Sequence, residues 1–352
     1  MVLIYYGICQ VLLVPTLVID IFNNEVGYGS IFSFFRPTFL CIAYLAILEL
    51  IVRANIDKIF LVLKIVIFVS FCYALIELFL LDYFSEFVFS LYKREERLSL
   101  RFSSTTFYGT TYYSSFVYFT MALLMFSNFE RTSRINNLIF TVLAYSLVML
   151  TQSKAGMFAL LLALCLMMGL SSVKWLRMAL MCMIFSLVII VLNINFVFDS
   201  LAEFNLVSVK QIYELIYHTE KSETLGDRME QTLYSLEIVN SHLGVFGGGL
   251  VPQDGSLESW PALFLYRYGL FGVLNFILFS VFISALSLKP FFRKVNIVYP
   301  SFAKAGFAWG LTLPITQIST PMMELGKTAF IANFFLALLT ISLRKKNFEA
   351  QY

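Results

Sequence analysis

The stretch Ile59–Leu81, IFLVLKIVIFVSFCYALIELFLL, is almost entirely apolar, and its length decides which kind of fold the chain can adopt. A helix needs about 20 mostly apolar residues to cross the hydrocarbon core of a bilayer. Peptide groups in lipid find no water to bond, so such a stretch must satisfy its own backbone as a helix. Ile59–Leu81 is therefore predicted to be a membrane-spanning helix.

The composition of the whole chain agrees with this first prediction. Hydrophobic residues make up 59% of the 352 residues and charged residues only 13%. Soluble domains carry about 25% charged residues. This composition excludes a soluble enzyme, a disordered chain and a disulfide scaffold, and it predicts an all-α, polytopic integral membrane protein. The formal net charge of +3 is too small to indicate that nucleic acid is a partner.

Ten stretches of the sequence are long and apolar enough to be membrane spans. They are Val2–Ile19, Pro37–Val52, Ile59–Leu81, Tyr112–Phe129, Ile135–Leu150, Ala155–Val173, Met178–Phe198, Tyr268–Leu288, Ser301–Ile318 and Thr328–Leu343. We therefore expect three parts: a bundle of seven spans in residues 1–198, a large loop in 199–267, and three spans with a tail in 268–352.

Lysines and arginines gather in alternate short loops, and such loops lie on the cytoplasmic side of a membrane. These loops follow the second, fourth, sixth, eighth and tenth spans and contain Arg53, Lys58, Arg131, Arg134, Lys174, Arg177, Lys289, Arg293, Lys294, Arg344, Lys345 and Lys346. Both termini are then predicted to be cytoplasmic. The other side receives three longer segments, Asp20–Arg36, Asp82–Thr111 and Asp199–Arg267.

The third of these segments is the most highly charged part of the chain. Between Asp199 and Pro261 it holds ten acidic residues, three basic residues and both histidines of the protein. Apolar residues at helical spacing predict that the segment is partly helical. Asp227 and Glu230 have the spacing of a capping box, which predicts a helix that starts there and runs to about His242.

Four cations stand at or near the external ends of the spans, where charged groups are candidates for function. They are Arg101, Lys154, Arg228 and Arg267, and Arg36 is a fifth. Lys154 lies in the polar junction Thr151–Gly156, which could bind an anion, although a lysine that only reaches for the interface is an alternative. Arg228 is expected in the first turn of its helix, where the helix dipole disfavours a cation.

The segment before the eighth span holds the candidates for a base. Gly247–Gly249 could let Gly248 approach a phosphate closely, although a plain turn is an alternative. Asp254, Glu258 and His242 could each accept a proton, or each could be a solvated surface group. No spacing typical of a metal site or of a nucleotide-binding loop occurs, so neither a metal nor another cofactor is expected.

Taken together, these features resemble those of the bacterial O-antigen polymerase and O-antigen ligase family. The resemblance rests on Thr151–Leu166 (TQSKAGMFALLLALCL), Gly226–Leu250 (GDRMEQTLYSLEIVNSHLGVFGGGL), Glu258–Leu274 (ESWPALFLYRYGLFGVL) and, more loosely, Arg101–Phe116 (RFSSTTFYGTTYYSSF). Lys154 stands where the family usually has an arginine. The histidine that ligases carry shortly after the Gly-rich turn is absent here, which favours a polymerase.

The resemblance implies a metal-independent glycosyltransferase of the bacterial inner membrane. Its substrates would be oligosaccharide and polymer carried on undecaprenyl diphosphate at the periplasmic face, with a chain-length regulator as an expected protein partner. Arg101, Lys154, Arg228, Arg267 and Gly248 would bind the diphosphate, and Arg228, Glu258, Asp254 or His242 would take part in the chemistry. An O-antigen ligase and a flippase for lipid-linked sugars are the alternatives, and a non-catalytic scaffold is a third.

Overall fold

The computed structural model describes residues 1–23, 26–79, 110–171, 223–241, 245–251, 257–293, 297–318 and 320–344, and the single positions 174, 177, 178 and 181. Within this part of the chain the regular elements are all helices, and their number is ten, as expected. Four are long and apolar enough to cross a membrane: α1 (Val2–Phe22), α2 (Tyr28–Arg53), α3 (Ile56–Phe79) and α12 (Trp260–Arg293).

The other six helices are α5 (Thr111–Thr132), α6 (Ile135–Leu150), α7 (Lys154–Leu170), α11 (Glu223–Ser241), α13 (Pro300–Thr316) and α14 (Gly326–Ser342). Nine of the ten helices coincide with predicted spans, and α11 lies in the predicted external loop. The predicted span Met178–Phe198 lies outside the described residues, apart from Met178 and Met181.

The start of the second span was predicted wrongly. The helix begins at Tyr28 and not at Pro37, so most of the predicted external segment before Pro37 is helical. Proline favours the first helical turn, but membrane helices also tolerate it inside, where it removes one N–H bond and crowds a carbonyl, here that of Ser33. The Ser30 hydroxyl accepts a hydrogen bond from the Gly27 amide at 3.5 Å, which closes the true first turn.

The start of the eighth span coincides with a break inside α12. Gly269 has φ 66° and ψ −165°, so the segment Trp260–Tyr268 is a separate helical piece before the predicted span. Only glycine adopts this conformation without strain. A Cβ at this position would also stand 1.8 Å from the carbonyl oxygen of Val245.

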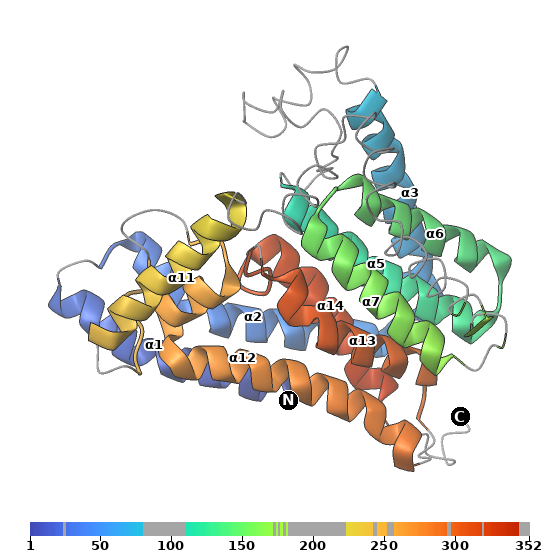
Figure 1. Ribbon diagram of the computed structural model, residues 1–352. Helices are drawn as coiled ribbons and strands as arrows, with labels where there is room; N and C mark the ends of the chain where they lie inside the picture. Colours follow the sequence, from blue (N-terminus) through green and yellow to red (C-terminus); the bar gives the residue numbers. More distant parts are fainter. Residues whose placement is uncertain are drawn as a thin grey trace.

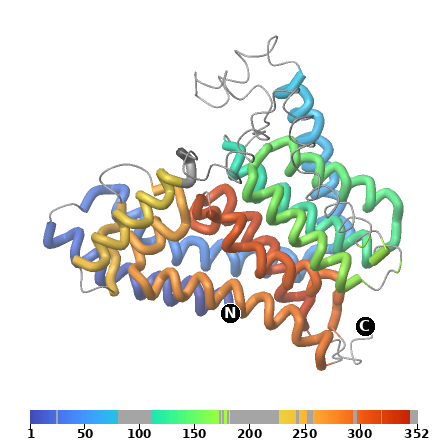
Figure 2. The backbone as a smooth tube through the Cα atoms, in the orientation of Figure 1, coloured from blue at the N-terminus to red at the C-terminus, as the bar shows by residue number. Residues whose placement is uncertain are grey.

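Two groups of helices meet across α13 and α14. Figure 1 shows α1, α2, α11 and α12 on one side and α3, α5, α6 and α7 on the other. The tube view follows α1 and α12 side by side along much of their length (Figure 2). Helix α14 packs on α2 and α5, and α13 packs on α12, α5 and α7, so these two helices join the groups.

Helix α5 forms the centre of the second group. Every residue from Ser114 to Phe129 is buried, because α3, α6, α7, α13 and α14 all contact it. The outer helices α1, α2 and α3 instead bury one face and expose large apolar residues such as Phe32 and Leu61 on the other. A helix that is apolar on its exposed face is typical of a surface in contact with lipid.

Loops that were predicted to share one side of the membrane lie together at one end of the bundle, which we call the Glu130 end. Lys304 at the start of α13 forms a buried ion pair with Glu130 near the end of α5, with 3.1 Å between Nζ and Oε2. The hydroxyl of Ser171, directly after α7, also donates to Glu130. The ends of three helices that are distant in sequence therefore meet there.

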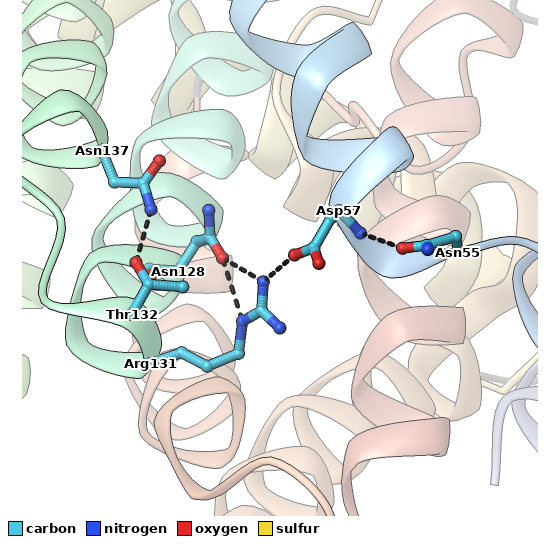
Figure 3. A network of polar contacts seen from close by, with 6 residues as sticks. All are labelled: Asn55, Asp57, Asn128, Arg131, Thr132 and Asn137. Atoms are coloured by element: carbon cyan, nitrogen blue, oxygen red, sulfur yellow. Dashed lines mark hydrogen bonds and ion pairs between the residues drawn. The ribbon is translucent and has the colours of Figure 1, made fainter.

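A second network at the Glu130 end joins α3 to α5 (Figure 3). The Arg131 guanidinium contacts Asp57 at 2.6 Å, and it also donates two hydrogen bonds to the amide oxygen of Asn128. Asn55 accepts a hydrogen bond from the backbone of Asp57 at the start of α3. The junctions after the second and fourth spans are thus neighbours, as the alternation of basic loops predicts.

Candidate functional site

Five of the predicted site residues lie in the described part of the chain: Lys154, Arg228, Gly248, Glu258 and Arg267. Arg101, His242 and Asp254 lie outside it. The five lie at or near the ends of helices that are opposite to the Glu130 end. We call this end of the bundle the Glu324 end, after the carboxylate at its centre.

Arg228 reaches from α11 to the start of α5. Its Nη2 donates a hydrogen bond to the Tyr112 hydroxyl at 3.2 Å, and its Cζ lies 5.5 Å from the centre of the Tyr112 ring. Helix α11 spans Glu223–Ser241, so Arg228 is in the second turn and Asp227 is inside the helix. The predicted capping box and the first-turn position of Arg228 were therefore wrong. They fail because the sequence before Asp227 continues the helix for another turn.

Glu258 is held next to the same helix. Its backbone N–H donates to the side-chain oxygen of Gln231 at 3.0 Å. Gln231 follows Arg228 by three residues, and residues at this spacing share one face of a helix. The carboxylate of Glu258 is exposed and forms no ion pair within the described chain. One face of α11 thus contacts the start of α5 through Arg228 and the segment before α12 through Gln231.

Lys154 begins α7, and the groups around it are already used for capping. The Ser153 hydroxyl accepts a hydrogen bond from the Gly156 amide at 3.3 Å, and the Thr151 hydroxyl accepts one from the Ser153 amide. Two hydroxyls of the junction that was expected to bind an anion therefore stabilise its turn instead. Neither the Arg228–Tyr112 hydrogen bond nor the Glu258–Gln231 hydrogen bond involves Lys154.

Arg267 is enclosed by protein groups. Its Nε donates to the carbonyl oxygen of Leu250 at 3.0 Å, and its Nη1 lies 3.2 Å from Oε2 of Glu324. The Tyr268 hydroxyl donates to the other carboxylate oxygen at 2.8 Å. Both charged side chains are more than nine-tenths buried. Arg267 therefore links the first part of α12 to the loop between α13 and α14.

The Gly-rich turn at Gly247–Gly249 stabilises this arrangement, because its amides donate hydrogen bonds to another part of the backbone. The Gly248 amide donates to the carbonyl of Tyr266 at 2.7 Å, and a Cβ on Gly248 would stand 2.0 Å from Ile238. The next turn of chain is fixed as well, because Asp20 accepts a hydrogen bond from the Leu250 amide at 3.2 Å. The Gly248 amide is thus occupied, and the glycine permits close packing of α11 on α12.

Three residues at the Glu324 end were not selected from the sequence: Tyr112, Asp20 and Glu324 gave no distinct motif. Glu324 could have been found, because an acid in a short apolar loop between two spans is expensive and needs a partner. No group of three or more metal-ligating side chains occurs within the described residues.

Comparison with known proteins finds no match to this chain among family models, curated proteins or solved structures. Its function must therefore be inferred from its own residues.

Proposed function

We propose that this chain is a polysaccharide polymerase of the bacterial inner membrane, with about ten transmembrane helices and both termini in the cytoplasm. It would join undecaprenyl-diphosphate-linked repeat units of O-antigen or capsule at the periplasmic face. Four helices of sufficient length and apolarity support the membrane assignment. The clustering of predicted cytoplasmic loops at the Glu130 end supports the topology, since helices of alternating direction place these loops together.

One observation carries the proposal. Helix α11 holds Arg228 against Tyr112 and, through Gln231, holds Glu258 beside the same face. A sugar transfer from a lipid diphosphate needs a cation for the leaving phosphate and a base for the attacking hydroxyl. An arginine binds phosphate oxygens through two parallel N–H bonds, and an exposed carboxylate can accept a proton. The two groups required by the reaction thus lie on adjoining elements.

In the proposed reaction a hydroxyl at the non-reducing end of a new repeat unit attacks the anomeric carbon of the growing polymer. The bond from this carbon to the carrier diphosphate breaks, and the diphosphate leaves with the bonding electron pair. The hydroxyl proton passes to Glu258, while Arg228 stabilises the charge on the diphosphate. The carrier diphosphate is already an activated leaving group, so no nucleotide sugar is needed, and Arg228 would stabilise its charge in place of a metal.

Arg101, Lys154 and Arg267 are proposed as further diphosphate-binding cations, and Asp254 and His242 as alternative bases. The large loop in residues 199–267 would carry most of the chemistry, between an N-terminal bundle in 1–198 and a C-terminal part in 268–352. A chain-length regulator is the proposed protein partner. Parallel Glu258→Gln, Asp254→Asn and His242→Ala variants identify the base, because only its loss should stop polymerisation.

The test is the length of polymer made in cells that carry Arg228→Ala. Long chains should be absent while the amount of membrane-inserted protein is unchanged. Glu230→Ala is the matched control, because Glu230 is an exposed residue of the same helix that takes no part in these contacts. Normal chain lengths in the Arg228→Ala strain would contradict the role of Arg228.

The product that accumulates after deletion of the chain separates the alternatives. Single repeat units attached to lipid A indicate a polymerase. Unattached polymer indicates an O-antigen ligase, and loss of every external product indicates a flippase. Unchanged polymer would contradict a role in polysaccharide synthesis and leave the scaffold alternative.

A further inference from the structure

Lys64 is a charged residue on α3, one of the helices long enough to cross a membrane. It is half-buried, and its ammonium stands 5.7 Å from the centre of the Phe140 ring on α6, against which α3 packs. Among the residues that the structure describes, this ammonium donates no hydrogen bond and forms no ion pair. A charge inside an apolar helix is costly, and it is a candidate for function by default.

Arg134 is a second cation at the same place. It is the N-cap residue of α6, six positions before Phe140, so its backbone lies about 9 Å along the helix from the ring that Lys64 contacts. Both side chains are long enough to close this distance, and their charges repel each other. Arg134 is exposed, and within the described chain its guanidinium neither donates a hydrogen bond nor forms an ion pair. Two cations of adjoining helices therefore approach each other at the Glu130 end.

The carboxylates at the Glu130 end are already paired with other cations. Within the described residues they are Glu49, Asp57 and Glu130, and their partners are Arg53, Arg131 and Lys304. Asp57 also interacts electrostatically with Lys64 and Arg134, but its Oδ1 contacts the Arg131 guanidinium at 2.6 Å, as Figure 3 shows. This one carboxylate faces the charges of Arg131, Arg134 and Lys64 together. An anion from outside the chain would therefore reduce the repulsion between Lys64 and Arg134.

The position of Lys64 indicates that this anion is the head of a lipid. Eight residues of helix place Lys64 about 12 Å from the start of α3 at Ile56. Leu61 and Phe68, which share its face of the helix, are apolar and 57% and 54% exposed, so they are placed to contact acyl chains. A lysine that bends back toward the start of its helix brings its charge to the level of the head groups. The phosphate of a lipid can thus meet both cations while its chains cover the exposed face of α3.

We propose that Lys64 and Arg134 form a binding site for the head group of an anionic phospholipid in the cytoplasmic leaflet. The leaflet rests on the proposed topology, which puts the Glu130 end in the cytoplasm. Basic residues between helices on this side are typical of sites for anionic head groups. The net negative charge of the ligand distinguishes it from phosphatidylethanolamine, whose own ammonium the two cations would repel. A bound lipid would link α3 to α6.

The site is tested with the full-length protein in detergent by native mass spectrometry, with phosphatidylglycerol as the probe. Lys64→Gln and Arg134→Gln should each lower the affinity for one bound molecule at least about tenfold, because each removes a charge-assisted hydrogen bond. Lys64→Arg should keep most of the binding. Lys58→Gln is the matched control, because Lys58 is an exposed lysine on a different face of α3 that forms no ion pair within the described chain. Wild-type affinity in Lys64→Gln, or an equal loss in Lys58→Gln, would overturn the proposal.

Thermal unfolding gives a second readout, because a ligand that binds only the folded protein raises the unfolding temperature. Phosphatidylglycerol should raise the unfolding temperature of the wild type and of Lys58→Gln, but not that of the Lys64→Gln/Arg134→Gln double variant. Phosphatidylethanolamine should have much less effect on the wild type, and an equal effect of the two lipids would contradict recognition of the negative charge. Glycerol phosphate should not displace phosphatidylglycerol at equal concentration, because it lacks the acyl chains; equal competition would contradict a lipid site.

The lipid site and the polymerase function can fail separately, because neither of these measurements uses the polymerase reaction. Loss of phosphatidylglycerol binding in Lys64→Gln, together with unchanged polymer after deletion of the chain, would uphold the lipid site and contradict the polymerase function. Wild-type binding in Lys64→Gln, together with loss of long polymer in the Arg228→Ala strain, would contradict the lipid site and uphold the function.

Discussion

Arg267 and Glu324 form an ion pair across 57 residues of sequence, with 3.2 Å between Nη1 and Oε2 and both side chains more than nine-tenths buried. The pair connects the start of α12 to the loop between α13 and α14. Tyr268 adds a hydrogen bond to the same carboxylate. The removal of either charge would leave the other in a place that water cannot reach.

Glu324→Ala should therefore lower the free energy of unfolding by about 3–5 kcal/mol, because it leaves Arg267 buried without a partner. Heat or denaturant unfolding of the purified protein in detergent measures this loss of stability. Glu49→Ala is the control, since the Glu49–Arg53 pair is exposed and contributes about 0.3–0.5 kcal/mol. Equal losses in the two variants would show that the buried pair does not stabilise the fold.

The buried pair of Lys304 and Glu130, at the opposite end of the bundle, should contribute to stability as much as the pair of Arg267 and Glu324. Lys304→Met leaves Glu130 with the Ser171 hydroxyl alone, and a loss of about 3–5 kcal/mol is expected. Asp57→Asn should cost less than about 1 kcal/mol, because Asp57 is 74% exposed in its pair with Arg131. A double-mutant cycle of Lys304→Met with Glu130→Gln measures the coupling, and a coupling near zero would contradict the pair.

Gly269→Ala should disturb the break in α12. Alanine at φ 66° and ψ −165° costs about 1–3 kcal/mol from conformation alone, and its Cβ would stand 1.8 Å from the carbonyl oxygen of Val245. Gly226→Ala is the opposite case, because nothing lies within 4 Å of its Cβ inside α11. It should stabilise the protein by about 0.5–1 kcal/mol. Unfolding temperatures of the two variants should fall on opposite sides of the wild type.

Tyr112 should position Arg228 mainly through its ring. Tyr112→Phe keeps the cation–π contact and should leave polymer length close to normal, whereas Tyr112→Ala should shorten the chains. The length distribution of polymer in cells, at matched protein level, measures both effects. Equal defects in the two variants would assign the role to the hydroxyl, and normal polymer in both would separate Tyr112 from the proposed reaction.

Much of the helical architecture could be predicted from the sequence. Apolar runs of sufficient length gave the existence of nine helices, because in such segments backbone hydrogen bonding leaves few alternatives to a helix. Boundaries were less certain. Tyr28–Arg36 has serines, a glycine and an arginine and does not resemble a span, yet it forms the first turns of α2. Packing within this segment stabilises its helix, since Ser30 and Ser33 are buried and the Gln10 side chain donates to the carbonyl of Phe34, which hydropathy alone does not report.

The candidate site could be predicted only in part. The sequence selected Arg228 and Glu258 as separate candidates, and the structure relates them through Gln231. The sequence also selected Arg267 and Gly248. In the structure the Arg267 guanidinium pairs with Glu324, and the Gly248 amide donates to the carbonyl of Tyr266. A cation that is paired and a cation that is free look identical in sequence. The carboxylate that pairs with such a cation belongs to an element far away in the chain, so the pair forms only when the helices pack.

The sequence by itself determined the helical fold class, the apolar helices and the gathering of charges at their ends, because these follow from local composition and from the need to satisfy the backbone. Only the tertiary structure decided which charges are neutralised. Arg267 and Lys304 are paired because α12 and α13 pack against the segments that carry Glu324 and Glu130.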